Sequence, residues 1–224
     1  MSVFSKVLVA NRGEIAVRVL QTLQAMGIAT AAVYADPDAN APHVALADEA
    51  FPLGGSTAEE TYLDRRKIIE LALRCGAEAV HPGYGFLAEN PAFSKECAEA
   101  GLVFIGPSPE TIELLGDKIR SKEAAVIAGV PVVPSSPMWT PGESRLDGLS
   151  SQIGFPLLVK AAAGGGGRGM RIVERVQDLD AALESASREA ASAFGDGRVF
   201  LERYIPAPRH VEFQVLADSS GNTI

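Results

Sequence analysis

The sequence is poor in cysteine, and the cysteines that it has are isolated. Cys75 and Cys97 are the only two among 224 residues, and neither has a CxxC neighbour or a histidine cluster nearby. Both fall in helix-like stretches. We therefore expect two buried or half-buried free thiols of a reducing compartment, and nothing in the sequence requires a disulfide between them.

Long apolar runs and an excess of positive charge are also missing. No run approaches the length of a membrane span. The start, MSVFSKVLVA, leads from Lys6 straight into a strand-like segment, with no room for the apolar region of a signal peptide. The formal net charge of −8 argues against nucleic acid or an anionic membrane as the main partner. We expect a cytoplasmic protein, and a nucleotide stays open as a ligand because it needs only a local cluster of cations.

Two nucleotide-binding motifs are absent or weak. No Gly-Lys-Ser/Thr occurs in the chain, which excludes the P-loop class of NTPases. Residues 83–88, GYGFLA, match the dinucleotide pattern GxGxxA after an expected strand. This match lies in a later strand–helix unit rather than the first, and Pro91 delays the next helix. Dinucleotide binding is therefore disfavoured.

The first 110 or so residues alternate between strand and helix patterns. Residues 7–10 are a buried-strand run, and the spacing of Ile15, Val19, Leu23 and Met26 predicts one apolar helix face that ends at Gly27. Further elements are expected as strands at 28–35, 77–82 and 102–107 and as helices at 65–74 and 91–100. Repeated units of this kind predict an α/β domain with a doubly wound parallel sheet.

The pattern changes after this domain. A charged helix is expected at 110–128, followed by a Pro/Ser-rich connector and a smaller α+β unit. That unit has expected strands at 155–160, 171–173 and 199–204 and a helix at 177–193. Apolar residues then alternate over 211–215, which predicts a strand, and SSGN predicts a turn into a returning strand. A hairpin that stops at this point suggests the front part of a longer protein.

The segment KAAAGGGGRGM, residues 160–170, follows the apolar run FPLLV and joins two expected strands. A flexible linker is disfavoured because serine and other polar residues are missing, and a plain hairpin turn does not need four consecutive glycines. Backbone without side chains can approach a polyphosphate closely, and Lys160 supplies a fixed charge. The segment therefore indicates an anion-binding flap, which we expect to be less ordered than the first domain.

Several stretches in order carry a family resemblance. FPLLVKAAAGGGGRGM resembles the ATP-grasp phosphate loop that biotin carboxylases share with carbamoyl-phosphate synthetases. KVLVANRGEIAVRV, HPGYGFLAEN, FIGPSPETIELLGDK and LERYIPAPRHVEFQVLAD are similar to biotin carboxylase segments in the same order and spacing. From about residue 6 to its end, the chain resembles the N-terminal half of a biotin carboxylase subunit or domain of an acyl-CoA or pyruvate carboxylase.

The resemblance implies a domain division and a reaction. The implied domains are an N-terminal domain at 1–114, a helical connector at 115–134, an ATP-grasp lid at 135–204, and the start of a truncated C-terminal ATP-grasp subdomain at 205–224. The implied reaction uses ATP to phosphorylate bicarbonate and then carboxylates biotin on a carrier domain. Implied partners are ATP, bicarbonate, the biotinylated carrier, a carboxyltransferase component and a second copy in a homodimer, with no nucleic acid and no membrane.

The resemblance also assigns site residues. The ATP-binding positions are Lys118, Lys160, Gly165, Gly166, Gly167, Glu202, Arg203, Ile205 and His210. Both lysines are expected at the ATP phosphates, the glycines in the lid loop, residues 202–205 around adenine through backbone groups, and the histidine beside the nucleotide. Arg203 stands where many members have lysine. The ligands of Mg²⁺, the bicarbonate site and the catalytic base are expected after residue 224, so the chain alone is expected to be an inactive fragment with no complete catalytic or metal site.

Plainer interpretations stand beside these assignments. Lys118 fits a solvated helix face, His210 a surface position, and Glu202 an exposed ion pair with Arg203 or Arg209, which would contribute little stability. Two other functions also stay open: another ATP-grasp ligase such as a carbamoyl-phosphate synthetase, or a non-catalytic binding or assembly module.

Other residues near the motifs favour structural roles. Arg12 and Glu14 are expected to serve packing, and His81 is expected to be structural because it precedes a proline. Tyr84 and Phe86 are expected in the core or at a domain interface.

Overall fold

The computed structural model describes residues 4–142, 147–162, 170–218 and 220–224. The chain divides into two compact units, Met1–Ile127 and Ala128–Ile224. The expected loss of order in the glycine loop, and Gly165, Gly166 and Gly167 themselves, lie outside the described residues. Among the described residues, no helix has the length and apolarity needed to cross a membrane.

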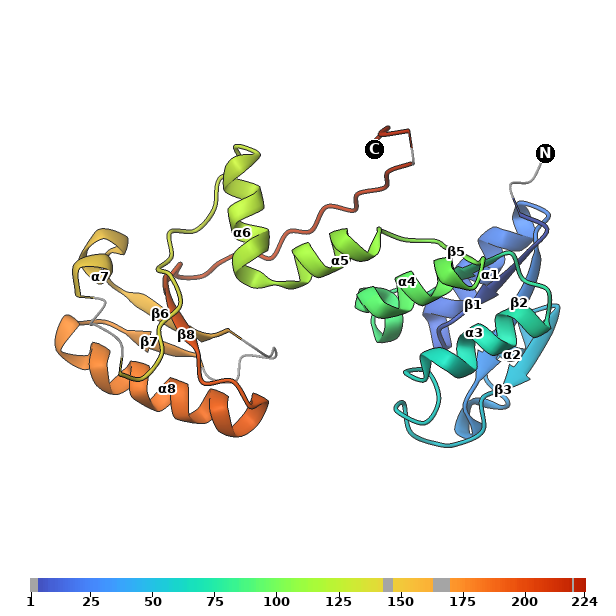
Figure 1. Ribbon diagram of the computed structural model, residues 1–224, viewed down its shortest axis with the longest axis horizontal. Helices are drawn as coiled ribbons and strands as arrows, with labels where there is room; N and C mark the ends of the chain where they lie inside the picture. Colours follow the sequence, from blue (N-terminus) through green and yellow to red (C-terminus); the bar gives the residue numbers. More distant parts are fainter. Residues whose placement is uncertain (1–3, 143–146, 163–169, 219) are drawn as a thin grey trace. The chain divides into compact units, whose positions relative to one another are not determined.

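Unit 1 is built on a five-stranded sheet with the order β3-β2-β1-β4-β5, in which every pairing is parallel (Figure 1). Its strands are β1 (Lys6–Val9), β2 (Ala29–Tyr34), β3 (Glu49–Pro52), β4 (Ala79–His81) and β5 (Val103–Phe104). Its helices are α1 (Gly13–Ala25), α2 (Pro42–Leu46), α3 (Arg65–Arg74), α4 (Pro91–Glu99), α5 (Pro109–Gly116) and α6 (Lys118–Ile127). The expected doubly wound parallel sheet is confirmed.

Alternation along β1 divides the core of unit 1 between the two faces of the sheet. Val7 and Val9 pack with Leu20 of α1 on one face. Leu8 packs on the other face, in the cluster that holds Ile68 of α3 and Phe93 of α4. Helices therefore cover both faces, as a parallel sheet requires.

The buried face of helix α1 is shifted from the one that the apolar spacing predicts. Its buried residues are Ala16, Leu20 and the predicted Leu23, and Val19 packs against the same cluster, whereas Met26 is 60% exposed. Met26 is the C-cap residue, beyond the last helical turn that faces the sheet. The predicted stop is confirmed, because Gly27 takes the left-handed φ of +72° that ends the helix.

Some elements of unit 1 depart from the predictions. Helix α2 and strand β3 were not predicted, and the short β3 sequence EAFP shows no buried run. The single helix predicted for 110–128 is two helices, since Asp117 interrupts it and its Oδ1 accepts hydrogen bonds from the backbone N of Ile119 and of Arg120, both at 2.9 Å. An N-cap of this kind begins a new helix.

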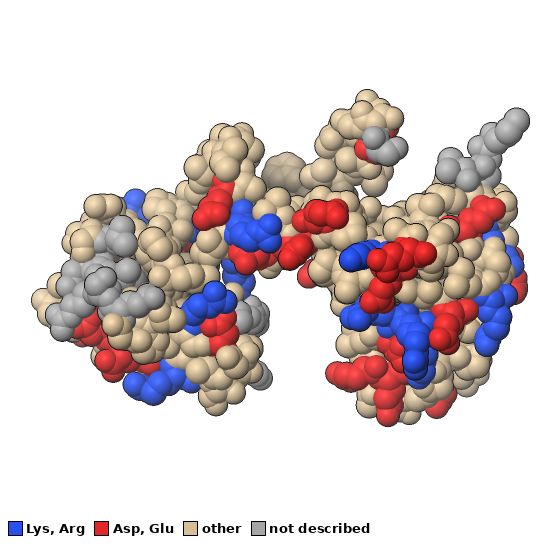
Figure 2. All heavy atoms as spheres, viewed as in Figure 1, with Lys and Arg blue, Asp and Glu red and all other residues tan. Residues whose placement is uncertain are grey.

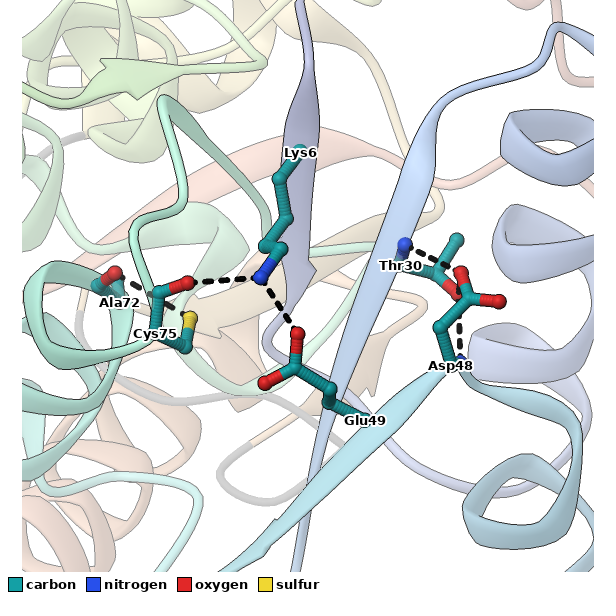
Figure 3. Close-up of polar contacts among 6 residues, drawn as sticks. All are labelled: Lys6, Thr30, Asp48, Glu49, Ala72 and Cys75. Atoms are coloured by element: carbon teal, nitrogen blue, oxygen red, sulfur yellow. Dashed lines mark hydrogen bonds and ion pairs between the residues drawn. The ribbon is translucent and has the colours of Figure 1, made fainter.

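Polar groups join the strands of unit 1 at the amino end of β1 (Figure 3). Lys6 Nζ forms an ion pair with Glu49 of β3 and donates a 2.9 Å hydrogen bond to the carbonyl of Cys75, after α3. Beside them, the hydroxyl of Thr30 donates to Asp48 at 2.7 Å. These contacts join segments far apart in the sequence. They lie at the amino end of the sheet and not at its carboxyl end.

Unit 2 contains an antiparallel sheet of three strands with the order β7-β6-β8. The strands are β6 (Leu157–Ala161), β7 (Arg171–Val173) and β8 (Val199–Arg203), and the helices are α7 (Asp147–Ile153) and α8 (Leu179–Phe194). Helix α8 lies along one face of the sheet (Figure 1), where Leu183 packs with Val159 and Leu201. The predicted α+β unit and its β6–β7 hairpin are confirmed, and α7 was not predicted.

The segment after β8 is extended and exposed. The strand predicted for 211–215 is wrong, because no ladder pairing forms there among the described residues and Val211 and Phe213 are 66% and 87% exposed. Apolar alternation makes a strand only when a neighbouring strand supplies hydrogen bonds. The turn that follows is confirmed, since Leu216 and Ile224 exchange two backbone hydrogen bonds of 2.9 Å.

Candidate functional site

Strands β6 and β8 bring Lys160 and Glu202 together. The register pairs Lys160 with Phe200 and Leu158 with Glu202, so Glu202 lies diagonally across from the lysine. Side chains alternate along each strand, and both residues point away from the face that α8 covers. Lys160 Nζ donates a hydrogen bond to Glu202 Oε1 in an ion pair. The structure thus places two of the predicted site residues in contact.

This ion pair is half-buried. The Lys160 side chain is 29% exposed and that of Glu202 is 13% exposed. The plainer interpretation paired Glu202 with Arg203 or Arg209. The structure instead pairs it with Lys160. A partly exposed lysine that projects from a fixed strand end can reach a phosphate group as well as a carboxylate. The arrangement therefore fits an anion-binding role for Lys160.

A segment before the sheet fixes β8 from its other side. Ser136 N donates to the carbonyl of Leu201 at 2.8 Å, and Trp139 exchanges two backbone hydrogen bonds with Val199. Ser135 forms a further bridge with Glu202. The sequence suggested only a Pro/Ser-rich connector here. Two isolated bridges pair this segment with the outer edge of β8, and proline is tolerated there because the outer side of an edge needs no donor.

The other residues expected around adenine follow directly along β8. Arg203 N donates to the carbonyl of Pro134 at 2.9 Å, and Tyr204 N donates to that of Pro156 at 3.0 Å. Ile205 comes next, outside the strand, and is 48% exposed. Glu202 and Arg203 are therefore the last residues of β8, Tyr204 is hydrogen-bonded beside the strand end, and Ile205 follows in the extended segment.

His210 lies apart from this arrangement. It is exposed in the extended segment, and its Nε2 is 3.0 Å from Glu212 Oε1. Both side chains are more than four-fifths exposed, at 83% and 82%. Within unit 2, the described residues thus bring Lys160, Glu202 and Arg203 onto neighbouring strands, but they do not bring His210 to that group.

Lys118 belongs to unit 1, where it is the first residue of α6 and is exposed. Its carbonyl accepts a 3.2 Å hydrogen bond from the Ser121 hydroxyl, and Asp117 caps the same helix turn. The side chain therefore projects from the start of a helix, where the macrodipole favours anions.

The carboxyl end of the unit 1 sheet carries a second polar group. Arg12, the N-cap residue of α1, forms two hydrogen bonds with the carboxylate of Asp38, of which the Nε–Oδ2 bond is 2.7 Å. Tyr62 donates its hydroxyl proton to the same carboxylate at 2.7 Å and accepts from Ala35 N at 3.0 Å. This network supports the structural interpretation of Arg12.

Contacts and burial within this network shift the pKa values of its titratable side chains. The hydrogen bond from Arg12 lowers the pKa of Asp38 from 3.8 to about 2, although burial opposes the shift. Burial raises the pKa of Tyr62 to about 12, and its hydrogen bond to Asp38 adds to the effect. Burial also lowers the pKa of His43, which is fully buried nearby. The carboxylate is therefore ionised at neutral pH and holds Arg12 in place.

The GYGFLA segment follows β4 and does not form a dinucleotide-binding turn. A short 3-10 helix, Phe86–Glu89, comes after it, and α4 begins only at Pro91. His81 Nδ1 accepts a 3.0 Å hydrogen bond from Gly83 N, which supports its structural interpretation. Phe86 stacks on Tyr62 at 5.1 Å between ring centroids, whereas Tyr84 is 58% exposed and is not a core residue of unit 1.

Charged residues of the described chain do not gather into a metal site. No group of three or more His, Cys, Asp or Glu side chains with suitable proximity occurs within the described ranges. On the face of unit 1 shown in Figure 2, Lys and Arg side chains are interspersed with Asp and Glu. The two cysteines are free thiols, with Cys97 buried and Cys75 half-buried, as predicted.

Two protein families match the chain in succession. The biotin carboxylase N-terminal domain family matches residues 3–112. The family of the carbamoyl-phosphate synthase L chain ATP-binding domain matches residues 117–224. The described sheet of unit 1 lies within the first match, and the described sheet of unit 2 lies within the second.

Curated relatives and solved structures agree with these matches. A biotin-dependent acyl-coenzyme A carboxylase alpha3 subunit of Mycobacterium leprae is 50% identical over 98% of this chain and 37% of its own length. A biotin carboxylase of a Nostoc species is 49% identical over 99% of this chain and 49% of its own length. The biotin carboxylase-beta-gamma-ATP complex from Campylobacter jejuni has a TM-score of 0.89 at 46% identity, and covers 99% of this chain and 50% of that one.

The fold and the site therefore define an ATP-grasp type of protein with a doubly wound N-terminal domain. The chain belongs to the biotin carboxylase family and matches its N-terminal half. It spans less than half the length of these two curated relatives, at 37% and 49%.

Proposed function

We propose that this chain supplies the N-terminal half of a biotin carboxylase, which uses ATP and bicarbonate to carboxylate biotin on a carrier protein. The observation that carries the proposal is Lys160, held by β6 on the face of the unit 2 sheet opposite α8, in contact with Glu202 of β8. This arrangement occurs in a chain that two consecutive domain families match in biotin carboxylase order. A related 2-oxoglutarate carboxylase domain from Hydrogenobacter thermophilus, 50% identical, is a complex with MgADP, ADP and bicarbonate.

The proposed roles follow the resemblance residue by residue. Lys118 and Lys160 would contact the ATP phosphates, and the glycines at 165–167 would cover them. Residues 202–205 would hold adenine through backbone groups, and His210 would lie beside the nucleotide. The strand geometry of Glu202 and Arg203 and the partial exposure of Lys160 support these roles.

Phosphoryl transfer from ATP depends on positioning and on charge neutralisation. Mg²⁺, when bound, would offset the phosphate charge, and the two lysines of this chain would add to that effect. The described residues hold no cluster of acidic side chains for the metal. We therefore place the metal ligands, the bicarbonate site and the base in the part of the family that this chain does not match.

Partners and location are proposed on the same basis. The carrier would present biotin, and a carboxyltransferase component would take up the carboxylated form and select the final acceptor. A homodimer is proposed because the Hydrogenobacter relative is described as a biotin carboxylase domain dimer. The domain division predicted from the sequence and the cytoplasmic location also stay predictions.

A second candidate has one observation in its favour. The family that matches residues 117–224 is named for the ATP-binding domain of the carbamoyl-phosphate synthase L chain, and the glycine-rich segment resembles a phosphate loop that both classes share. The match of residues 3–112 to the biotin carboxylase N-terminal domain favours biotin as the acceptor. The two candidates differ in product, carboxylated biotin or carbamoyl phosphate.

The product test uses a chimera of this chain and the C-terminal half of the Campylobacter jejuni biotin carboxylase, a 46% identical relative. Labelled bicarbonate, MgATP and a biotinylated carrier are supplied, with ammonia and glutamine in parallel reactions. We expect label on the carrier and none in carbamoyl phosphate, and loss of labelling in a Lys160→Gln chimera. Labelled carbamoyl phosphate would instead support the second candidate.

The isolated chain provides a further check. We expect no bicarbonate-dependent ATP hydrolysis by it, because the family resemblance places the acidic Mg²⁺ ligands after residue 224 and phosphoryl transfer depends on the metal. Turnover above background that is lost on Lys160→Gln would contradict this expectation. A folded chain that binds a protein partner but no nucleotide would favour the non-catalytic module.

A further inference from the structure

The Glu202 carboxylate and the Lys160 ammonium occupy the same face of the unit 2 sheet, opposite α8. Val159 and Leu201, their neighbours in the strands, lie in the core beneath α8. Alternation therefore directs Lys160 and Glu202 to the opposite side. Any anion that approaches Lys160 on this face also approaches a carboxylate.

The two members of the ion pair differ in how firmly they are held. The Glu202 backbone is paired on both sides, by Leu158 of β6 and by the bridge to Ser135. The backbone of Glu202 is thus held from two sides, and its side chain is 13% exposed. Lys160 lies near the end of β6 on a longer, more flexible side chain, 29% exposed. The lysine is the member that can change partners.

A second acid–base pair in the same unit provides a comparison. Arg171 of β7 pairs with Glu189 of α8 at 2.9 Å, and the register opposite Val159 places Arg171 on the face that α8 covers. That pair joins strand to helix across the packed side. The Lys160–Glu202 pair instead joins two neighbouring strands on the side of the sheet opposite α8.

We propose that Glu202 is a gating residue for the nucleotide phosphates, which holds Lys160 in an ion pair that the phosphates must displace. The inference rests on the proposed role of Lys160 as a phosphate ligand. It adds a side-chain function to a residue that the family resemblance uses through its backbone. Glu202 thereby lowers the affinity of the chain for anions. The reduction is expected to be larger for a nucleotide with more phosphate charges.

The size of the effect follows from the charge that is removed. A unit charge about 6 Å from a phosphate changes the affinity roughly tenfold at the effective dielectric constant of a partly screened protein surface. Glu202→Gln keeps the shape of the side chain but removes the negative charge. It should therefore tighten ATP binding about tenfold, with smaller gains for ADP and AMP and none for adenosine.

Isothermal titration of the full 224-residue chain with ATP, ADP, AMP and adenosine tests the proposal. The variants are Glu202→Gln, Lys160→Gln and the double variant, with Glu189→Gln as a matched control on the packed face. We expect the gain of Glu202→Gln to grow with phosphate number, to vanish in the Lys160→Gln background, and to be absent from the control. ATP binding by Glu202→Gln but not by the unaltered chain would also support the gate.

Three outcomes would overturn the proposal. Equal ATP affinities of the unaltered chain and Glu202→Gln would show that the carboxylate does not compete. A gain that is the same for adenosine and ATP would show a structural effect on the adenine side. If neither protein binds ATP while the chain is folded, both the gate and the proposed nucleotide site in this chain fail, whereas the first two outcomes leave the proposed function intact.

Discussion

The ion pair between Arg12 and Asp38 gives a quantitative prediction about the stability of unit 1. Asp38 is 7% exposed and accepts hydrogen bonds from Arg12 and Tyr62. Asp38→Asn removes the charge and replaces one acceptor oxygen by an amide NH2 group. Either Arg12 or Tyr62 then loses its hydrogen-bond acceptor. We expect a lower free energy of unfolding at neutral pH.

The magnitude follows from the change in proton affinity on folding. The pKa of Asp38 falls from 3.8 to about 2, mainly through the Arg12 hydrogen bond. Because a tenfold change in proton affinity corresponds to about 1.4 kcal/mol, the ionised carboxylate contributes about 2 kcal/mol. The pKa is depressed in the folded state, so this contribution is present above pH 3.8 and is lost as the pH falls toward about 2.

Urea unfolding followed by far-ultraviolet circular dichroism measures this difference. The matched control is Glu70→Gln, which removes an exposed partner of Arg66 at 3.8 Å and should cost less than about 0.5 kcal/mol. The loss of unfolding free energy caused by Asp38→Asn should shrink in acid below pH 3.8. The loss caused by the control substitution should stay small at every pH. A loss no larger than that of the control at neutral pH would refute the reasoning.

Three further predictions concern packing and thiol chemistry. Leu201→Ala should destabilise unit 2 by about 2–5 kcal/mol because Leu201 is fully buried, and the fluorescence of Trp139, the single tryptophan, should report an earlier transition. Gly83→Ala should cost about 1–3 kcal/mol in urea unfolding, since its Cβ would lie 2.7 Å from neighbouring side-chain atoms at a φ of +66°. Gly85→Ala, at a φ of +72° with open space, is its control, and an equal loss would show that backbone strain alone decides. Cys97 should resist iodoacetamide until the protein unfolds, because burial raises the pKa of its thiol to about 12, and labelling at the rate of an exposed thiol would contradict its burial.

Local signals predicted the elements that form from their own residues. The strand near residue 7 and the helix after it were expected because a buried run and a 3.6-residue spacing are local features. The parallel sheet followed from the repetition of these units. Strand β3 was not predicted because Glu49–Pro52 is short and lies at the sheet edge, where its sequence shows no buried run.

Contacts between distant segments were harder to foresee. The pairing of Ser136 and Trp139 with β8 depends on the sheet register, and the prolines around them suggested a connector. The partner of Glu202 likewise follows from the diagonal offset between β6 and β8 rather than from neighbours in the sequence. The strand predicted at 211–215 failed for the same reason, since apolar alternation does not supply a pairing partner.

The sequence predicted which residue types form the candidate site, but only part of their spatial arrangement. Lys160 was singled out by its place before the glycine-rich segment, and the structure puts it in contact with Glu202 on the sheet face opposite α8. His210 was assigned by resemblance, yet its surroundings in the described chain are solvent and Glu212. Its role beside the nucleotide stays a prediction.

The most direct measurement of the proposed biotin carboxylase function is the mass of a biotinylated carrier after incubation with MgATP, bicarbonate and the chimera that contains this chain. We expect a carrier heavier by one carboxyl group, and an unmodified carrier when the chimera carries Lys160→Gln. A carrier that stays unmodified with a folded, ATP-hydrolysing chimera would contradict the proposed function. Equal carboxylation by the Lys160→Gln variant would contradict the role of this lysine at the phosphates.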